Sequence, residues 1–354
     1  MPAADSFRLS LGLHRVLEPV GVLPQQAKKL SASLPIQSCE ILIEVSSLNV
    51  DSASFRQFYE SNNKDSEATG KAILAVIKER GKLQNPVTGS GGMLIGTVKE
   101  VGADITNPDL KLLRPGDKVA TLVSLTLTPL KVKKIKAVTP GIDRVEVEGH
   151  AILFNSGIAA KIPPDLNDGL VLAALDVAGA PAQVAKLVRP NMNVVVIGGG
   201  GKSGILSLYA AKRALANSGK VVALEYSPKS CDRLRKLSFV DEVVEGNAQH
   251  AVEASEKIIA ALGGQKADVV INVANVPGTE MASILPAKDN GTVYFFSMAT
   301  SFTNAALGAE GVAADVKLMI GNGYTAGHAD FTLQILRESQ EIRTIFEALY
   351  EAQS

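Results

Sequence analysis

A run of glycines carries the clearest chemical signal in the chain. Four are consecutive and a fifth follows after two residues, in the segment Gly198–Gly204, directly after the apolar run Val194–Ile197. As a G-x-G-x-x-G pattern, Gly199 permits a tight turn, Gly201 lets a pyrophosphate approach the backbone, and Gly204 lets a helix lie close to the strand. The N–H groups at the start of that helix, and its dipole, favour a phosphate. The segment therefore predicts a dinucleotide-binding turn.

An acidic residue follows the turn at a characteristic sequence separation. Glu225 lies 225 − 204 = 21 residues after Gly204, at the end of the next apolar run, which is about the spacing at which a carboxylate reaches the adenosine ribose. Such a carboxylate accepts hydrogen bonds from both ribose hydroxyls of NAD and repels the extra phosphate of NADP. Ser227, Lys229 and Arg233 come next and partly offset that repulsion. We expect NAD as the cofactor, with NADP also possible.

Two other interpretations of the glycine run were compared with this one. Gly201-Lys202-Ser203 resembles the end of a P-loop, but that motif needs a glycine where Val196 stands, so a P-loop is excluded. A turn that binds nothing, followed by a coincidental acid, stays open. The apolar strand before the glycines and the amphipathic helix after them favour dinucleotide binding.

The second half of the chain, from about residue 161, alternates short apolar runs with helical patterns. This alternation indicates a parallel sheet with helices on both faces. Ligands of such sheets bind beyond the carboxyl ends of the strands, so Asn275, Pro277, Ser297 and Met298 are expected to line the nicotinamide pocket. The full set expected to bind the cofactor is Gly199, Gly200, Gly201, Lys202, Ser203, Gly204, Glu225, Tyr226, Asn275, Ser297 and Met298. Strands are expected at Val194–Ile197, Lys220–Leu224, Glu242–Val244, Ala267–Val273, Thr292–Ser297 and Val316–Ile320, and a last helix at Phe331–Glu351.

The first half, residues 1–160, holds short β-branched runs separated by Gly and Pro, which is typical of a twisted, barrel-like, mostly antiparallel β region. One helix is predicted at Ser66–Arg80, ended by Gly81. Lys131, Lys133 and Lys136 form either an anion-binding strip or the solvated face of an edge strand. Strands are expected at Glu40–Leu48, Gly96–Val101, Lys118–Val123 and His150–Asn155.

Composition narrows the class of protein. A chain of 354 residues suggests two domains, and its net charge of zero gives no general attraction to nucleic acid or membrane surfaces. No apolar run approaches the roughly 18–20 residues of a membrane helix. Only Cys39 and Cys231 occur, far apart, so we expect no disulfide framework and a location in the cytoplasm.

Several segments together resemble the medium-chain dehydrogenase/reductase superfamily. The resemblance implies an α/β fold, with a Rossmann doubly wound parallel sheet and a GroES-like, mostly antiparallel β catalytic domain. It implies a catalytic domain at residues 1–160, completed by 325–354, and a dinucleotide-binding domain at 161–324. The segments are Ser47-Leu-Asn-Val-Asp51, Gly96-Thr-Val-Lys-Glu-Val-Gly102, Leu113-Arg-Pro-Gly-Asp-Lys-Val119, Lys161-Ile-Pro-Pro-Asp165 and the glycine turn.

The chain departs from the zinc-dependent members of that superfamily. They carry Gly-His-Glu where this chain has Gly91-Gly92-Met93, so Gly92 stands at the position of the zinc-binding histidine. There is also no cysteine near Leu48–Ser52 or Ala174–Asp176, and the four histidines are scattered. We therefore expect no bound metal and zinc-independent chemistry.

A closer resemblance concerns the first hundred residues. His14-Arg-Val-Leu-Glu-Pro19, Gly21-Val-Leu-Pro-Gln25, Asn49-Val-Asp-Ser-Ala-Ser54 and Asn85-Pro-Val-Thr-Gly-Ser-Gly-Gly-Met93 are similar to the L-erythro-3,5-diaminohexanoate dehydrogenase family of bacterial lysine fermentation. The resemblance implies oxidative deamination of (3S,5S)-3,5-diaminohexanoate at C3, which yields 5-amino-3-oxohexanoate, ammonia and a reduced nicotinamide. The expected partner is thus a small amino-acid substrate.

That reaction requires a group that takes a proton from the C3 ammonium, because only a neutral amine donates electrons into a forming imine. Asp51 and Asp176 are the leading candidates, to act as base or to bind the ammonium groups; the alternative for each is a turn cap or a solvated carboxylate. His150 is a further candidate base, or else a packing residue. His14, Arg15 and Glu18 form a charged cluster, directed either to the substrate or to the surface.

The superfamily extends its sheet across a dimer axis at the position of Val316–Ile320, so the resemblance implies a homodimer; the alternative is an ordinary edge strand. Two other functions remain open. One is a zinc-free quinone or enoyl reductase with the same fold and cofactor. The other is a module that binds NAD without chemistry, since a glycine turn reports binding alone.

Overall fold

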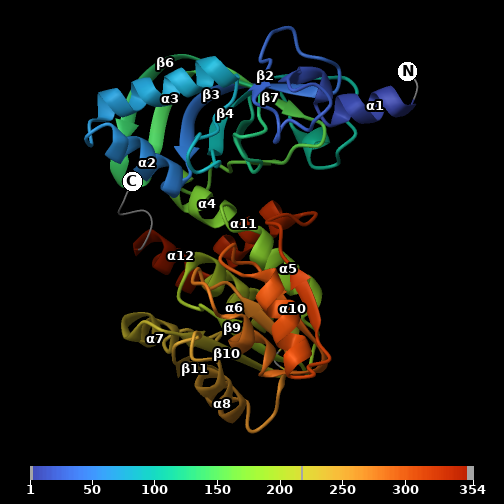
Figure 1. Cartoon of the computed structure of the whole chain (residues 1–354), viewed down its shortest axis with the longest axis vertical. Coiled ribbons are helices and arrows are strands. Elements are labelled where there is room, and N and C mark those ends of the chain that lie inside the picture. The colour runs from blue at the N-terminus through green and yellow to red at the C-terminus, as the bar shows by residue number, and fades with distance from the viewer. Residues whose placement is uncertain (1–2, 217, 349–354) are drawn as a thin grey trace. The chain divides into compact units, whose positions relative to one another are not determined.

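The computed structural model describes residues 3–216 and 218–348, which fall into two compact units. The first unit ends at Asp168 and the second begins at Gly169 (Figure 1). The boundary therefore lies eight residues later than the expected change at residue 160, 168 − 160 = 8. Each unit has its own sheet and its own buried apolar core, so each is described separately.

The first unit is built on a six-stranded antiparallel sheet, as predicted. Buried Ile41, Ile43 and Val45 alternate along the central strand β3, and they pack with side chains of the neighbouring strands. In spatial order the strands are β6 (Leu130–Thr139), β7 (Arg144–Phe154), β3 (Glu40–Val50), β4 (Gly92–Val101), β5 (Lys118–Thr121) and β8 (Ala159–Lys161), beside the separate pair β1 (Val16–Glu18) and β2 (Lys29–Leu30).

Helices cover one part of this sheet. The prediction of a helix at Ser66–Arg80 is confirmed as α3: Asp65 caps its first turn, Ile73 and Ile77 are buried, and Gly81 ends it with a φ of 65°. The other helical segments of the unit are α1 (Ala3–Ser10), α2 (Ser52–Ser61) and the 3₁₀ turns Leu13–Arg15, Leu110–Leu112 and Pro140–Ile142.

The lysine-rich segment forms β6, which was not among the expected strands. It lies at one end of the strand order, paired on one side with β7. Lys133 lies 3.8 Å from the carboxylate of Glu148 on β7, and both side chains are more than half exposed. The structure thus favours the edge-strand interpretation, in which charge keeps the open edge from pairing.

A buried ion pair joins the N-terminal segment to the sheet. Glu40 is fully buried, and both its oxygens accept hydrogen bonds from the Arg15 guanidinium, at 2.8 and 2.5 Å. His14 Nε2 lies 2.7 Å from the same carboxylate, while Glu18 is exposed and does not share in these contacts. Of the three residues expected to form one charged cluster, His14 and Arg15 thus hold Glu40, and Glu18 alone lies at the surface.

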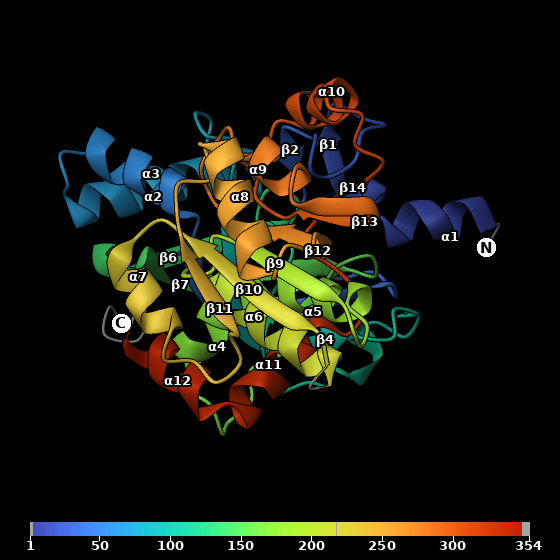
Figure 2. The same ribbon diagram turned by 90° about the horizontal axis from the view of Figure 1, so that it is seen from below.

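The second unit is a six-stranded sheet in which every pairing is parallel, with the strand order of a doubly wound Rossmann fold (Figure 2). The α/β class and both sheet types are thus as predicted. In spatial order its strands are β11 (Glu242–Glu245), β10 (Lys220–Glu225), β9 (Asn193–Ile197), β12 (Ala267–Asn272), β13 (Ala287–Phe295) and β14 (Lys317–Ile320).

Two helical layers cover this sheet. Figure 2 shows α8, α9 and α10 over one face and α5, α6, α11 and α12 over the other. Val195, Ile197 and Leu224 point from the strands into the core beneath the first layer. The helices are α4 (Asp168–Leu175), α5 (Gly179–Leu187), α6 (Lys202–Leu215), α7 (Pro228–Leu234), α8 (Ala251–Ala261), α9 (Glu280–Ile284), α10 (Phe302–Gly311), α11 (His328–Glu338) and α12 (Gln340–Phe346).

The C-terminal helices differ from expectation in two ways. The single helix expected at Phe331–Glu351 is broken at Ser339, and its last residues, 349–351, lie outside the described residues. The backbone of Ser339 is extended, with a φ of −112°, and its side chain caps α12 by accepting from Ile342 N–H. α11 packs against α5 and α6, with Leu333 and Leu336 buried, and α12 packs against α6. The described part of the segment, up to residue 348, is therefore grouped with the second unit, because its apolar face is buried against helices of that unit.

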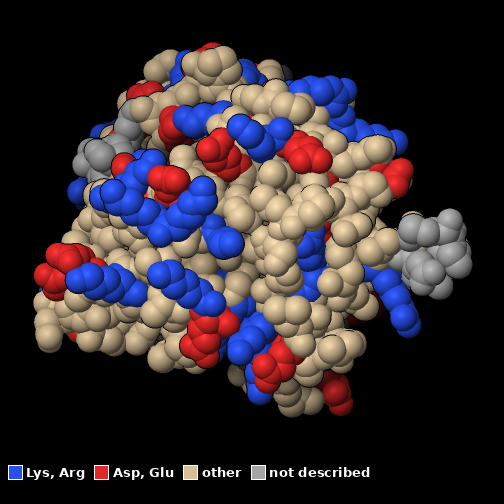
Figure 3. All heavy atoms as spheres, turned by 90° about the horizontal axis from the view of Figure 1, so that it is seen from above, with Lys and Arg blue, Asp and Glu red and all other residues tan. Residues whose placement is uncertain are grey.

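Charged side chains are mixed on the surface. Figure 3 shows Lys and Arg interspersed with Asp and Glu on one face, with uncharged areas between them. Within the described ranges, no single helix is long and apolar enough to cross a membrane; α4 and α5 meet that test only when taken together, across a bend of 53°.

The Glu40 pair makes a pH-dependent contribution to stability. Burial alone would raise the pKa of the Glu40 carboxyl, but hydrogen bonds from Arg15, His14 and the Gln37 N–H outweigh burial and lower the pKa from 4.5 to about 2. Since the folded pKa lies below the ordinary one, the stabilisation is complete above pH 4.5 and is lost as the pH falls through about 2.

We predict that Glu40→Gln lowers the free energy of unfolding by about 3 kcal/mol at pH 7, since it leaves the buried Arg15 without its counter-charge. The difference from the unchanged protein is expected to narrow between pH 4.5 and 2.5. Urea unfolding followed by circular dichroism at both pH values measures it. A difference that stays the same across this range would contradict the assignment.

Candidate active site

The turn that leads from β9 into α6 is formed by glycines with different tasks. Gly198 has a φ of +85°, and a Cβ there would lie 2.8 Å from the backbone of Ala274. The tight-turn role expected for Gly199 thus belongs to Gly198. At Gly199 a Cβ would meet the Ala223 side chain at 3.0 Å, so this residue is constrained by packing instead.

The roles expected for the other two glycines agree with the geometry. A Cβ at Gly204 would lie 2.3 Å from the carbonyl oxygen of Gly198, so only glycine lets α6 start so close to the strand. Gly201 is the N-cap of α6 and has open space beside it, with the Gly198 oxygen 4.0 Å away as the nearest atom. Within the described chain no side-chain hydrogen bond caps this helix, and a free helix N-terminus of this kind is suited to binding a phosphate.

Glu225 is held in place by backbone donors. Its Oε2 accepts from Gly200 N–H at 2.8 Å, and its Oε1 accepts from the N–H groups of Tyr226 and Ser227, both at 3.0 Å. The carboxylate therefore has a fixed position at the end of β10, next to the glycine turn. This is the position from which an acid bonds the adenosine ribose.

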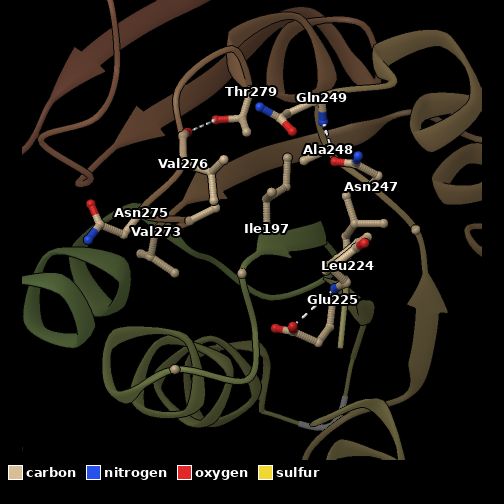
Figure 4. A pocket seen from close by; sticks show the side chains of 15 residues that line it. Ile197, Leu224, Glu225, Asn247, Ala248, Gln249, Val273, Asn275, Val276 and Thr279 are labelled. Atoms are coloured by element: carbon tan, nitrogen blue, oxygen red, sulfur yellow. Dashed lines mark hydrogen bonds between the residues drawn. The ribbon is translucent and has the colours of Figure 1, made fainter. Parts of the chain in front are cut away.

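A cavity of about 490 Å³ opens beyond the carboxyl ends of β9, β10, β11 and β12. Figure 4 shows Ile197 near its centre, with Glu225 and Asn275 on different sides. Of the expected cofactor residues, Gly201, Glu225, Tyr226 and Asn275 line it. The remaining lining residues are Ile197, Gly198, Leu224, Gly246, Asn247, Ala248, Gln249, Val273, Ala274, Val276 and Thr279.

Some of these were missed from the sequence, and three residues expected to line the nicotinamide pocket, Pro277, Ser297 and Met298, do not line this cavity. Asn247 and Gln249 directly follow β11, so the end-of-strand rule used for the later strands would have found them. Ser297 and Met298 are not among the lining residues of this cavity. The Ser297 hydroxyl accepts from Ala299 N–H, and Met298 is 78% exposed.

The loop after β12 is fixed by a buried amide. Asn272 is fully buried, and its Nδ2 donates to the hydroxyls of Thr279 and Ser283, both at 2.8 Å. Its Oδ1 accepts from Ala274 N–H at 3.1 Å. Because every polar atom of this side chain is bonded, the loop from Val273 to Thr279 forms a defined wall of the cavity.

The two candidate aspartates lie in different units. Asp51, in the first, caps α2: its Oδ1 accepts from the N–H groups of Ala53 and Ser54 and from the Ser90 hydroxyl. Asp176, in the second, follows α4 and accepts from Lys202 Nζ at 2.6 Å, where Lys202 is the first residue of α6. Asp51 thus has the cap role named as its alternative, and Asp176 is paired with the glycine turn.

His150 is not close to Asp51. It stands opposite Glu44 on β3, seven residues before Asp51, which at about 3.3 Å per residue is roughly 23 Å. Its Nε2 donates to the carbonyl of Ala32 at 2.8 Å. The structure thus gives His150 a hydrogen bond from β7 to the segment after β2 and does not bring it together with the aspartate.

Among the residues the structure describes, no group of three or more His, Cys, Asp or Glu side chains is arranged to hold a metal ion. At the position of the zinc ligand, Gly92 has a φ of +111°, and a Cβ there would lie 2.1 Å from the Asn49 carbonyl. A histidine cannot replace Gly92 without moving this backbone.

Known proteins are similar to this chain at two levels. The family model described as L-erythro-3,5-diaminohexanoate dehydrogenase N-terminal domain matches residues 14–163. Two relatives named L-erythro-3,5-diaminohexanoate dehydrogenase, from Acetoanaerobium sticklandii and Fusobacterium nucleatum subsp. nucleatum, are 56% and 52% identical over 340 residues, which is 96% of this chain and 98% of each relative. The chain belongs to the L-erythro-3,5-diaminohexanoate dehydrogenase family. It is therefore an oxidoreductase with a nicotinamide cofactor.

Solved structures extend the comparison to the fold of this family. An alcohol dehydrogenase from Thermotoga maritima aligns with a TM-score of 0.55 at 16% identity, covering 89% of this chain and 86% of the other. A quinone oxidoreductase from Coxiella burnetii aligns with a TM-score of 0.54 at 17% identity, covering 89% and 84%. At such low identity these likenesses show the fold alone, a Rossmann unit with a GroES-like unit.

Two glycines of the turn give a matched pair of substitutions in this family member. Gly201→Val is expected to lower the melting temperature less than Gly204→Ala, because its Cβ enters open space at a φ of −84°. It is expected to weaken NADH binding at least about tenfold, ~1.4 kcal/mol. Gly204→Ala is expected to lower stability by about 1–3 kcal/mol, because its Cβ meets backbone atoms.

Thermal melting and NADH fluorescence titration measure the two effects. Unchanged NADH affinity in Gly201→Val would show that the turn does not bind the diphosphate.

Proposed function

We propose that this enzyme oxidatively deaminates (3S,5S)-3,5-diaminohexanoate at C3, giving 5-amino-3-oxohexanoate, ammonia and reduced cofactor in lysine fermentation. Relatives that carry the name of this activity are more than half identical over nearly the whole chain. The observation that carries the proposal within the structure is the cavity beside Gly201 and Glu225, with open backbone at the turn and a fixed carboxylate. A module without chemistry, or a quinone or enoyl reductase, is less well supported, since the relatives at high identity carry neither name.

The residues present fit a nicotinamide dinucleotide. The start of α6 and Gly201 would hold the diphosphate, and Glu225 the adenosine ribose. When bound, the nicotinamide accepts the two electrons and the hydrogen that leave C3. We propose NAD as the preferred form, because Glu225 has no basic residue within ion-pairing distance in the described chain and would repel a ribose phosphate.

The substrate brings two ammonium groups and a carboxylate, so its recognition requires anionic side chains. Asp51 and Asp176 are proposed for this task, as receptors of ammonium or as the base that makes the C3 amine neutral. In Asp51, Oδ1 accepts three hydrogen bonds and Oδ2 is bonded to no other described residue, so one oxygen is fixed while the other remains open. His150 receives no role, because its ring is used in the sheet.

We further propose a homodimer in which β14 pairs with its copy. This strand lies at the end of the sheet, and its Leu318 and Ile320 are 36% and 58% exposed. Two copies of one edge satisfy each other in an isologous contact. A cytoplasmic location is also proposed, consistent with Cys39 and Cys231, which are both free and buried.

An ammonia-release assay tests the activity. Purified protein with 3,5-diaminohexanoate is expected to release one ammonia per reduced cofactor, with a higher kcat/KM for NAD than for NADP because of Glu225. Cofactor oxidation with a quinone as acceptor serves as the comparison. Turnover of the quinone but not of the diamino acid would refute the proposal and favour the reductase.

Asp51 has a matched control in Asp65, which caps α3 in the same manner. Because asparagine is also a good N-cap, Asp51→Asn and Asp65→Asn should both stay folded. Asp51→Asn is expected to lower kcat/KM at least about 100-fold, the scale of losing an acid–base group. Asp65→Asn is expected to stay within about twofold. Equal kcat/KM in the two variants would reduce Asp51 to a helix cap.

A further inference from the structure

Gly200, in the middle of the glycine turn, is fixed by hydrogen bonds at both its N–H and its carbonyl. Gly200 N–H donates to Glu225 Oε2 at 2.8 Å. On the other side, Arg233 Nη2 donates to the Gly200 carbonyl at 2.7 Å. Glu225 ends β10 and Arg233 lies on α7, so two neighbouring elements fix one glycine. The nearest atoms to a Cβ at Gly200 would be those of Ser230 at 2.7 Å, so a side chain is excluded as well.

These contacts fix two successive peptide planes. The carbonyl of Gly200 and the N–H of Gly201 belong to one planar, trans peptide, so they point in opposite directions. When Arg233 draws the Gly200 carbonyl toward α7, the Gly201 N–H turns the other way. There it is bonded only loosely, to the Gly198 oxygen at 3.5 Å. Arg233 therefore determines the direction of the N–H group at the N-cap of α6.

Such control is needed because the turn has four consecutive glycines. Glycine has the widest backbone freedom of all residues, and adjacent glycines allow the peptide between them to rotate. A rotated Gly200–Gly201 peptide would present a carbonyl oxygen where the N–H now lies. An oxygen with partial negative charge would repel a diphosphate that the N–H attracts.

The surroundings of Arg233 indicate a role beyond stability. Its Nε is buried and has no hydrogen-bond partner in the described part of the chain, and its contact with the Ser230 hydroxyl is long at 3.4 Å. A buried donor without an acceptor is unfavourable for folding. At 2.7 Å, the hydrogen bond to the Gly200 carbonyl is shorter than the contact with Ser230, and it is the one that orients the cofactor turn.

We propose that Arg233 is a positioning residue for the diphosphate of the cofactor, acting by holding the Gly200–Gly201 peptide in the orientation that presents N–H. This inference rests on the proposed function only in that the turn binds a nicotinamide dinucleotide. It does not depend on which substrate is oxidised.

The test compares Arg233→Ala with Arg235→Ala. Arg235 is two residues away, half exposed, and bonded to Asp232 at 2.8 Å, so it controls for loss of a cation from the same region. We expect Arg233→Ala to raise the dissociation constants of NADH and ADP-ribose about tenfold, with adenosine affinity and kcat at saturating NAD within about twofold. Arg235→Ala should leave all of them unchanged. Arg233→Lys, with one donor group of its own, should restore part of the affinity.

Two results of this test would overturn the proposal for Arg233. One is an unchanged ADP-ribose affinity in Arg233→Ala. The other is an equal loss of affinity for adenosine and ADP-ribose, which would mean general disruption of the pocket. If Arg233→Ala does not fold, Arg233→Lys and Arg233→Gln are measured in the same way. If the unchanged protein binds NADH but releases no ammonia, only the proposed substrate fails. If the unchanged protein does not bind NADH, the proposed function itself is refuted, together with the role of Arg233.

Discussion

The start of α6 lies so close to the end of β9 that not even a methyl group fits between them. A Cβ at position 204 would come within 2.3 Å of the Gly198 oxygen and 2.6 Å of the Gly199 backbone. Because of this close contact, the N-terminus of a 14-residue helix lies at the edge of the cavity. Its N–H groups and its dipole both favour an anion at that place. Glu225, Arg233 and the loop after β12 are then arranged around that point.

Side chains of the same type do different work in this enzyme because their partners differ. Glu40 is buried against Arg15 and stabilises the first unit, whereas Glu225 is only partly buried and is fixed by three N–H groups beside the cavity. Asp65 caps its helix by accepting from one N–H, whereas Asp51 accepts from two N–H groups and from the Ser90 hydroxyl, and its second oxygen is open. Hydrogen-bonding environment, and not residue type, thus distinguishes the structural carboxylates Glu40 and Asp65 from Glu225 and Asp51, which are proposed to bind ligands.

The sequence predicted the features that depend on local pattern. The range of α3 was predicted because Asp65 and Gly81 mark its ends, and the parallel sheet because apolar strands alternate with helices. The glycine turn was predicted because only glycines satisfy its close contacts, although the tight turn fell at Gly198 and not at Gly199.

What the sequence did not show depends on contacts between distant residues. The partner of Arg15 and His14 is Glu40, about 25 residues away, and no spacing rule indicates it. The break at Ser339 was hidden because the apolar period continues through it. The placement of Asn247 beside the cavity follows from the strand order, in which β11 lies next to β10, and this order is set by packing of the whole sheet.

The central claim is that backbone N–H groups at the start of α6 bind the cofactor diphosphate. Hydrogen exchange of the amides from 198 to 206, with and without NADH, measures this directly. The account predicts that NADH slows exchange most in this segment. If NADH binds with saturation and exchange there stays unchanged, while another segment becomes protected, the claim is contradicted.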